Sequence, residues 1–420
     1  MVSSRRLMPP RFLVLTQYFP PEIGAVPVRI AALVRHLRAG GHEVEVVTGM
    51  PNYPGESIFE GYRGRLYMRE EVDGVRIHRV WLYAATGSGL RRILNYATFA
   101  AMSLIGILRA KRPSYIFVES VPLTVGVAGW LGGLLRRVPT IFNVADLWVE
   151  AARDMGVIRS SFVLKLADRL ERWLYRKARF VNAVTDGIRD NLVGEKQLPA
   201  RKVLFLPNGV DTTLFAPRPA DAELARELDL TGKAVVLYAG VLGIPQGLEV
   251  AIDAFALLGD RAPEALLLFI GAGSEEQKLK QHAASLGLKN VRFLPPRPVE
   301  DIARLYSVAF AGYAGLKDLP LFDGFRPSKL MPIMASGKPV LYSGQGEGAR
   351  LIERAGSGVV VRPGDSAALA AAIESLLQDR SRAAALGAAG RQYVEQHLGW
   401  PALLADWVRQ LTAAEQEISK

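Results

Sequence analysis

The sequence predicts an α/β protein built from two Rossmann-like domains, each a doubly wound parallel sheet, facing a cleft. Short apolar runs rich in β-branched residues alternate with helical patterns along all 420 residues, which is typical of parallel sheets. Eleven such runs are too many for one comfortable sheet. A chain of this length is also about right for two domains.

The predicted strands keep the same rhythm in both halves of the chain. They lie at 11–16, 43–48, 115–120, 140–146 and 180–185, and then at 234–240, 265–271, 291–295, 308–313, 338–344 and 358–364. Helical patterns separate them, as at 26–39 and 159–178. Each half therefore reads as its own α/β domain.

The domain boundary is predicted in the stretch LPNGVDTTLFAPRP (206–219), which has three prolines, an Asn-Gly turn and no periodicity. It divides the chain into a first domain over 1–206 and a second over 207–399, followed by a helix over 400–420 that extends past the second sheet. Ligands of doubly wound domains bind outside the carboxyl ends of the strands. We therefore expect the functional residues in the cleft between the two domains.

The composition excludes several kinds of site. With no cysteine, the chain has neither disulfides nor thiolate metal sites, and its five histidines are scattered without metal-ligand spacing. We expect no metal and no cofactor. The first apolar run is too short for a signal peptide, and no segment has the roughly 20 apolar residues that span a bilayer.

The net positive charge is confined to the first half of the chain. Residues 1–200 hold 28 Lys and Arg against 17 Asp and Glu, which accounts for the whole net charge of +11. A membrane surface, a phosphorylated substrate or nucleic acid would suit such a surface. Nucleic acid is disfavoured because no binding motif or interleaved aromatic pattern accompanies the basic residues.

The stretch 90–113 favours a membrane surface. Its mostly apolar centre, 93–108, lies between Arg91-Arg92 and a second basic cluster, so that it could lie in the lipid interface. The stretch 159–180 adds an amphipathic, Arg-rich pattern. The alternative is a helix packed on the sheet with snorkelling basic ends.

The stretch GFRPSKLMPIMASGKPV (324–340) predicts an anion site. A helix that starts at Pro327 leaves the backbone N–H groups of Ser328, Lys329 and Leu330 free in its first turn. The helix dipole and the charges of Arg326 and Lys329 favour a phosphate or diphosphate there. The alternative is an ordinary connecting helix whose Pro-Ser start is only a cap.

Glycines follow the predicted strands at the same edge. Gly240 and Gly271 follow two strands of the second domain, and Gly24 follows the first strand of the first domain. Each glycine alone is ordinary strand-to-helix turn chemistry. Their common place at strand carboxyl ends is what points to a binding site.

With these segments the chain resembles the GT-B glycosyltransferases of family 4, and most of all the fucosamine-transferase-like branch that builds O-antigen and capsule. The resemblance rests on QYFPPEIGAVPVRIAALVRHLRAGGHEVEVVTGMPNYPGE, NVADLWVEAA, LPNGVDTTLF, LYAGVLGIPQGLEVAIDAF, VRFLP and PSKLMPIMASGKPV, in that order. It covers nearly the whole chain. It implies transfer of a sugar from a nucleotide diphosphate sugar, with retention at the anomeric carbon and no metal.

The resemblance also implies roles for individual residues. Asp146 would touch the transferred sugar or the acceptor as the catalytic residue, within an acceptor-binding first domain. The donor site would lie in the nucleotide-sugar-binding second domain, and Gly24 would approach it across the cleft. The donor diphosphate would be bound by Gly24, Arg326, Ser328, Lys329 and Leu330, and the nucleoside by Leu294, Pro295, Gly240 and Gly271.

The chain departs from the family pattern at several of these places. Gly324 and Pro332 stand where many relatives carry two glutamates that bind the nucleotide ribose, with Asp323 and Glu347 as nearby carboxylates. Other departures are Val241 and Gln246 in place of Arg and Lys, and Ala145-Asp146 in place of a histidine. Lys329 and Arg326 would then carry most of the charge that faces the diphosphate.

The resulting expectation is a cytoplasmic, retaining hexosyltransferase at the inner face of the membrane, working in cell-surface polysaccharide synthesis. It would use a UDP-sugar first and a GDP-sugar second, with a glycan or polyprenyl-linked acceptor. No pair of carboxylates suits a glycosidase-like double displacement, which favours stabilisation of the leaving diphosphate. Two alternatives stay open: a degenerate sugar-nucleotide-binding or partner subunit, and a nucleotide-sugar epimerase.

Overall fold

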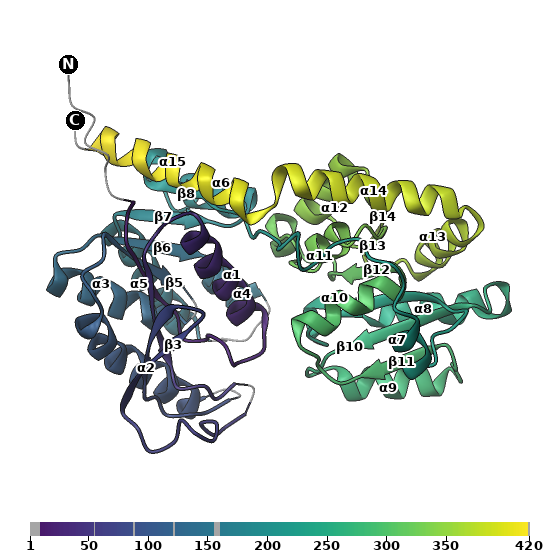
Figure 1. Cartoon of the computed structure of the whole chain (residues 1–420), viewed down its shortest axis with the longest axis horizontal. Helices are drawn as coiled ribbons and strands as arrows, with labels where there is room; N and C mark the ends of the chain where they lie inside the picture. The colour runs from purple at the N-terminus through teal and green to yellow at the C-terminus, as the bar shows by residue number, and fades with distance from the viewer. Residues whose placement is uncertain (1–8, 54, 87–88, 121, 155–159, 419–420) are drawn as a thin grey trace. The chain divides into compact units, whose positions relative to one another are not determined.

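The computed structural model divides into two compact α/β units. Unit 1 comprises Met1–Pro207 and Leu403–Lys420, and unit 2 comprises Asn208–Ala402 (Figure 1). The described residues are 9–53, 55–86, 89–120, 122–154 and 160–418. Residue 159, the first of the predicted helix over 159–178, lies outside them. The chain passes between the units one residue after the predicted boundary.

Unit 1 contains an eight-stranded sheet in the order β3-β4-β2-β1-β5-β6-β7-β8. The strands are β1 (Phe12–Leu15), β2 (Val44–Gly49), β3 (Tyr67–Val72), β4 (Val75–Val80), β5 (Tyr115–Glu119), β6 (Thr140–Val144), β7 (Phe180–Ala183) and β8 (Val203–Phe205). All neighbours pair in parallel except β3 and β4. The carboxyl ends of the parallel strands therefore share one edge.

Three strands of this sheet were missed from the sequence. β3 and β4 form an antiparallel hairpin whose turn is Asp73-Gly74, both with positive φ. An Asp-Gly pair between alternating residues is a strong hairpin signal, so this turn was predictable. β8 is only three residues long, which is too short to show a pattern. The sheet of unit 1 is thus parallel up to its β3 edge.

Helices cover both faces of this sheet. They are α1 (Ala25–Ala39), α2 (Leu90–Arg109), α3 (Leu123–Arg136), α4 (Trp148–Asp154), α5 (Ser161–Lys177), α6 (Asp186–Gly194) and the 3-10 turn η1 (Ala200–Lys202). Leu13 and Leu15 of β1 face a core that includes Phe99 of α2 and Leu174 of α5. Phe12 of β1 points to the opposite face of the sheet, where it contacts Trp407, because successive side chains of a strand alternate between the two faces.

The C-terminal helix α15 (Trp400–Ile418) completes unit 1 and not the second sheet. Trp407 is fully buried against Phe12 and Phe117, with ring centroids 5.7 and 5.9 Å away. Its indole N–H donates to Oδ1 of Asn182 at 3.0 Å. The apolar ring and its polar atom are both satisfied there, which explains why the chain returns to unit 1.

Unit 2 contains a six-stranded parallel sheet in the order β11-β10-β9-β12-β13-β14. The strands are β9 (Ala234–Ala239), β10 (Ala265–Ile270), β11 (Val291–Leu294), β12 (Ala309–Gly315), β13 (Val340–Ser343) and β14 (Gly358–Val361). All six were predicted from the sequence. Every pair of neighbours runs in parallel.

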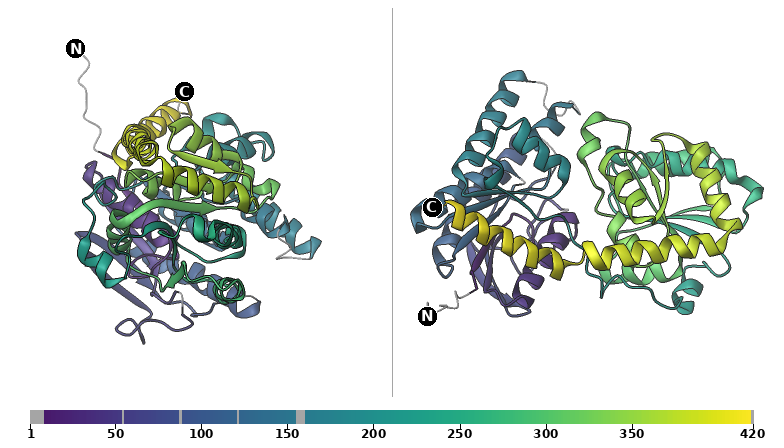
Figure 2. Two further views of the ribbon diagram at one scale, coloured as in Figure 1. Left: turned by 90° about the vertical axis from the view of Figure 1, so that its right-hand side faces the viewer. Right: turned by 90° about the horizontal axis from the view of Figure 1, so that it is seen from above.

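The helices of unit 2 form two layers around that sheet (Figure 2). They are α7 (Ala222–Glu227), η2 (Ile244–Gln246), α8 (Glu249–Leu258), η3 (Gly259–Arg261), α9 (Glu276–Ser285), α10 (Val299–Val308), η4 (Pro320–Gly324), α11 (Leu330–Ala335), α12 (Gly346–Ala355), α13 (Ser366–Gln378) and α14 (Arg380–His397). Alternate residues of β9 divide between the two cores: Val235 and Leu237 face one, Val236 and Tyr238 the other. Among the described helices of both units, none is long and apolar enough to cross a membrane.

The Trp407 contacts predict a large cost of truncation. Trp407→Ala should lower the free energy of unfolding of unit 1 by about 3–5 kcal/mol, because it removes a buried aromatic ring and leaves a cavity. Urea denaturation followed by circular dichroism measures this. Arg409→Ala on the same helix is the matched control, because its ion pair with Asp406 is exposed and should contribute about 0–1 kcal/mol. Equal effects of the two changes would contradict the assigned role of Trp407.

Candidate functional site

The sheet of unit 2 has a topological switch point between β9 and β12. From β9 the order runs through β10 to β11 on one side and from β12 through β14 on the other, so the loops that follow β9 and β12 diverge. Ligands of open α/β sheets bind at such a point, outside the strand carboxyl ends. The residues Gly240, Gly271 and Leu294-Pro295 follow or end β9, β10 and β11. The predicted nucleoside residues therefore share this edge.

Gly240 and Gly271 leave the backbone bare at this edge. Gly240 has φ 146° and Gly271 has φ 149°, a region that residues with a side chain rarely adopt. A Cβ on Gly271 would overlap the carbonyl oxygen of Gly240, and a Cβ on Gly240 would overlap Cε of Lys329. The two glycines thus let two loops and the Lys329 side chain meet without an intervening side chain.

Lys329 is a desolvated cation beside these glycines. Its ammonium lies 5.2 Å from the centre of the Tyr238 ring, where a cation is attracted to the aromatic face. No ion pair joins it to a carboxylate of the described residues. Burial lowers the pKa of Lys329 to about 8. An anion that bound here would gain an unusually strong interaction with the protonated amine.

The helix after Lys329 starts later than the sequence analysis expected. α11 begins at Leu330 rather than at Pro327, and Ser328 and Lys329 lie in a turn. Pro332 has no N–H to donate to the carbonyl of Ser328, so the helical hydrogen bonds begin only with Ile333 N–H and Lys329 O.

This later start corrects the expectation for Leu330. Its N–H donates to the carbonyl of Pro327 at 3.2 Å, and the residue is fully buried. A free Leu330 N–H for an anion was therefore a wrong prediction. Ser328 is exposed and Lys329 partly buried, so these two keep the predicted position.

Arg326 is held by a carboxylate of this chain. Its guanidinium lies 4.0 Å from Glu347 of α12, and the two side chains are only 9% and 8% exposed. Glu347 was one of two carboxylates noted as possible replacements for the family glutamates, and the other, Asp323, is exposed. Because Glu347 offsets the charge of Arg326, Lys329 is the stronger candidate for the diphosphate.

A hollow of about 300 Å³ also opens at this edge of unit 2. It is lined by residues that follow β9, β12 and β14, among them Gly247, Lys317 and Pro363. Lys317 lies 3.5 Å from Glu249. None of the residues predicted from the resemblance lines this hollow.

In unit 1, Gly24 ends a loop that a buried carboxylate organises. Glu22 accepts hydrogen bonds from the N–H groups of Phe19, Asn52 and Tyr53 at 3.2, 3.0 and 2.9 Å. Burial raises the pKa of Glu22, and these three hydrogen bonds oppose the shift. A Cβ on Gly24 would meet only ordinary contacts, so packing alone does not require glycine there.

Asp146 lies two residues beyond the carboxyl end of β6, beside a buried ion pair of Arg29 with Glu119. Desolvation by the surrounding protein raises the pKa of Asp146, while Arg29 opposes the shift and Glu119 adds to it. Asp146 is nevertheless an exposed residue, so water also reaches it.

A chain of hydrogen bonds from Trp407 through Asn182 and Asn143 holds Glu119 in place. Asn143 donates to Glu119 at 2.8 Å, and Asn182 donates to Asn143 at 2.7 Å. Trp407 of α15 donates to Asn182 in turn. Sequence reasoning missed this chain of hydrogen bonds because its members lie far apart in the sequence. The signal that could have found them is a polar residue in a buried strand, as with Glu119 in β5, Asn143 in β6 and Asn182 in β7.

A group of carboxylates in unit 1 is already occupied by a lysine. Glu150, Asp168 and Glu171 lie close enough to hold a metal ion. Lys196 places its ammonium 2.6, 3.0 and 2.7 Å from these three side chains. Burial opposes the charge of Lys196, but the carboxylates around it outweigh burial and raise its pKa. The group is therefore explained as an internal ion-pair network.

Two family models together match most of the chain. One, described as a glycosyl transferase 4-like domain, matches residues 24–209, and another, described as glycosyl transferases group 1, matches residues 221–393. They fall on unit 1 and unit 2.

Two curated relatives match along nearly their whole length. The chain is 28% identical over 418 residues to a putative colanic acid biosynthesis glycosyl transferase, WcaI, of Escherichia coli K12, covering 96% of this chain and 99% of the relative. It is 30% identical over 402 residues to a GDP-mannose-dependent α-(1-6)-phosphatidylinositol monomannoside mannosyltransferase of Mycolicibacterium smegmatis, covering 92% and 94%.

Solved structures have the same fold. Anabaena HepE in complex with UDP and glucose superposes with a TM-score of 0.72 at 19% identity, covering 96% of this chain and 99% of that one. WaaG, a glycosyltransferase involved in lipopolysaccharide biosynthesis, gives 0.65 at 17% identity, covering 94% and 98%. The paired domain matches, the full-length relatives and the two sheets agree, and the chain belongs to the GT-B glycosyltransferases of family 4.

Proposed function

We propose that the protein is a retaining, metal-independent glycosyltransferase that moves a sugar from a nucleoside diphosphate sugar to a glycan or lipid-linked acceptor. The observation that carries the proposal is Lys329, a desolvated ammonium beside Gly240 at the switch point of unit 2. As the bond from the sugar to the diphosphate breaks, negative charge grows on the leaving oxygen. A preorganised cation at that position lowers the barrier.

The proposed division of labour follows the two units. Lys329, the Ser328 turn and the bare backbone at Gly240 and Gly271 receive the nucleoside diphosphate. Asp146 in unit 1 orients the acceptor hydroxyl or stabilises positive charge on the sugar. The raised pKa of Asp146 suits a group that exchanges a proton with a hydroxyl near neutral pH.

The identity of the base is part of the proposal. The Mycolicibacterium smegmatis relative is named as GDP-mannose-dependent, whereas HepE was solved with UDP and glucose. The relative is more similar in sequence, and the HepE likeness concerns the fold. We therefore give GDP-sugars the same standing as the UDP-sugars expected from the resemblance.

A screen of nucleotides tests the proposed donor. Purified protein is heated with UDP, GDP, ADP, dTDP and their sugars, and a ligand at 100 times its Kd should stabilise the fold by about 2.7 kcal/mol. Transfer to an acceptor should release the nucleoside diphosphate and keep the anomeric configuration, as read by NMR. Asp146→Asn should keep nucleotide binding and lose transfer.

The outcomes of this screen separate the proposal from its alternatives. Binding without release of nucleoside diphosphate in the presence of any acceptor would indicate a degenerate subunit. An isomerised donor recovered without acceptor would indicate an epimerase. No stabilisation by any nucleotide would remove the donor assignment.

The desolvation of Lys329 predicts how affinity depends on charge and pH. Lys329→Ala should weaken nucleoside diphosphate binding by about tenfold or more, and leave nucleoside binding unchanged, because only the diphosphate meets the ammonium. In the wild type, affinity should be flat below pH 8 and fall by up to about tenfold per pH unit above it, because the amine of the empty site must then take up a proton on binding.

Calorimetric titration at a series of pH values measures both effects. Lys317→Ala is the matched control, because Lys317 follows β12 at the same edge and is already near Glu249. Equal losses for nucleoside and nucleoside diphosphate in Lys329→Ala would contradict the diphosphate assignment.

We also propose that unit 1 contacts a membrane surface through the first turns of α2 and α5. Leu90, Ile93 and Leu94 are exposed on α2, and Phe162, Val163 and Leu166 are exposed on α5. The opposite side of α2 is buried, with Phe99 and Ile107 in the core. The helix therefore packs on the sheet, as the alternative held, and still leaves apolar side chains and Arg91 outside.

Vesicle cosedimentation tests this contact. Ile93→Asn with Phe162→Asn should reduce binding to phosphatidylglycerol-containing vesicles by about tenfold or more, because each side chain loses apolar burial in the interface. Leu257→Asn with Leu286→Asn is the control, since both residues are exposed in unit 2. The same loss in both double variants, or none in either, would rule out this surface.

A further inference from the structure

A second pocket lies in unit 1 at the edge opposite to Asp146. It has a volume of about 840 Å³ and is lined by residues where β6, β7 and β8 begin. Thr140 is the first residue of β6, and Arg179 and Lys202 directly precede β7 and β8. The five residues of β6 separate this pocket from the carboxyl edge by roughly 13 Å. The pocket is therefore distinct from the candidate functional site.

The charge that lines the pocket is strongly positive. Five basic residues and one acidic residue contribute to its wall: Arg137, Lys177, Arg179, Arg201, Lys202 and Glu417. Glu415 pairs with Arg179 at 2.6 Å, and Lys202 donates to the neutral carbonyl of Arg176 at 2.6 Å. Within the described parts of the chain, Arg137, Lys177 and Arg201 form no ion pair with a carboxylate.

Helix ends account for only part of this charge. Arg137 and Lys177 lie at the carboxyl ends of α3 and α5, where a cation offsets the helix dipole. Each helix end is equivalent to roughly half a negative charge. Helix α15 also ends at this pocket, at Ile418. Three such ends and the two carboxylates Glu415 and Glu417 together offset about 3.5 of the five positive charges, so that about 1.5 remain for a ligand.

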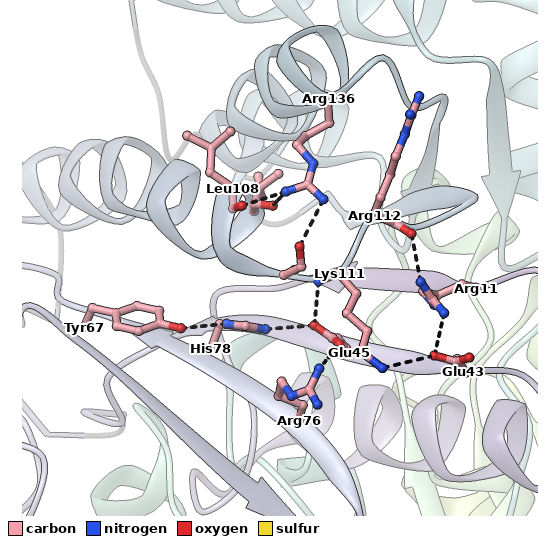
Figure 3. A network of polar contacts seen from close by, with 12 residues as sticks. Arg11, Glu43, Glu45, Tyr67, Arg76, His78, Leu108, Lys111, Arg112 and Arg136 are labelled. Carbon is pink, nitrogen blue, oxygen red and sulfur yellow. Dashed lines mark hydrogen bonds and ion pairs between the residues drawn. The ribbon is translucent and has the colours of Figure 1, made fainter.

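The neighbouring part of the same edge shows the contrast. Where β2 and β4 begin, basic side chains are paired within the protein (Figure 3). Glu45 pairs with Arg76 at 2.5 Å and with His78 at 2.9 Å, and Glu43 pairs with Arg11 at 2.8 Å. A fold that neutralises its basic residues in this way gives Arg137, Lys177 and Arg201 of the pocket no such carboxylate partner among the described residues.

Crowding of the positive charges is visible in Lys202. Burial, with a smaller contribution from the charge of Arg179, lowers the pKa of Lys202 to about 8. A bound anion would oppose both effects and raise the pKa of Lys202, because its negative charge would favour the protonated amine. The local electrostatics therefore favour occupation by an anion.

Size and lining narrow the chemistry of the ligand. The volume exceeds that of a single phosphate ion, and apolar groups accompany the charges: Leu134, which is 61% exposed, with Trp130 and Ile418. Arginine forks suit the oxygens of a phosphate in particular. We propose that this pocket is an accessory site for a phosphate ester or diphosphate that carries an apolar or organic group.

Two sources could supply such a ligand. A lipid with a phosphate or diphosphate headgroup would place its head between the basic residues and its chain along Leu134. A soluble phosphate ester would use the same basic groups without the apolar rim. The chemistry recognised by the pocket is the same in both cases.

Hydrogen–deuterium exchange of the full chain tests the site, because it reports each edge separately. Inorganic pyrophosphate or geranyl diphosphate should slow exchange in segments 133–140 and 199–206. In Lys177→Gln with Arg201→Gln, the half-saturating concentration should rise by about tenfold or more, because two charge-assisted contacts are lost. Segment 324–330 reports the proposed donor site, so failure there and failure here are distinguishable.

The matched control removes two exposed positive charges of unit 1 away from the pocket, by Arg65→Gln with Arg69→Gln. This variant should keep the wild-type response. Protection by pyrophosphate alone would support a soluble ligand, and protection only by geranyl diphosphate would support a lipid. No protection in the wild type, or the same loss in both double variants, would overturn the proposal.

Discussion

The parallel pairing of the strands is the constraint on which the rest of the structure depends. It places the carboxyl ends of the parallel strands of each unit at one edge and their amino ends at the other, with β3 of unit 1 running in the opposite direction. At the carboxyl edge of unit 2 the loops diverge between β9 and β12. There the backbones of Gly240 and Gly271 approach each other and Lys329 closely, because neither glycine has a side chain. The candidate site and the basic pocket of unit 1 are both consequences of which residues stand at these edges.

At the carboxyl edge the chain uses few charges and keeps them poorly solvated. Arg326 is paired with Glu347, and Lys329 rests against an aromatic ring. A cation already stripped of water interacts more strongly with developing charge than one that must first lose its hydration. In the proposed donor site, one desolvated lysine would therefore compensate for the basic residues that the resemblance places at Val241 and Gln246. The departure from the family pattern would then be a shift of charge to fewer groups.

Sequence periodicity found eleven of the strands because each is a mostly apolar run. It missed β3 and β4, where polar residues interrupt the pattern, although the Asp73-Gly74 turn marked the hairpin. It placed the start of α11 too early. Pro332 has no N–H to donate to the carbonyl of Ser328, and this missing hydrogen bond, rather than residue preference, delays the start of the helix. The return of α15 to unit 1 depends on Trp407 and Asn182, which are 225 positions apart.

The excess of basic residues in the first half of the sequence is neutralised at one part of the amino edge of the unit 1 sheet and not at another. Beside β2 and β4, Glu43 and Glu45 pair with basic residues. Burial opposes the ionisation of Glu45, but the hydrogen bonds from His78 and from the Lys111 backbone outweigh burial and lower its pKa. Beside β6 to β8, no comparable buried carboxylate stands among the described residues that line the pocket. Basic groups held in place by helix ends but not neutralised cost stability through mutual repulsion. An anion in the proposed accessory site would offset this cost, so that its occupation would stabilise unit 1.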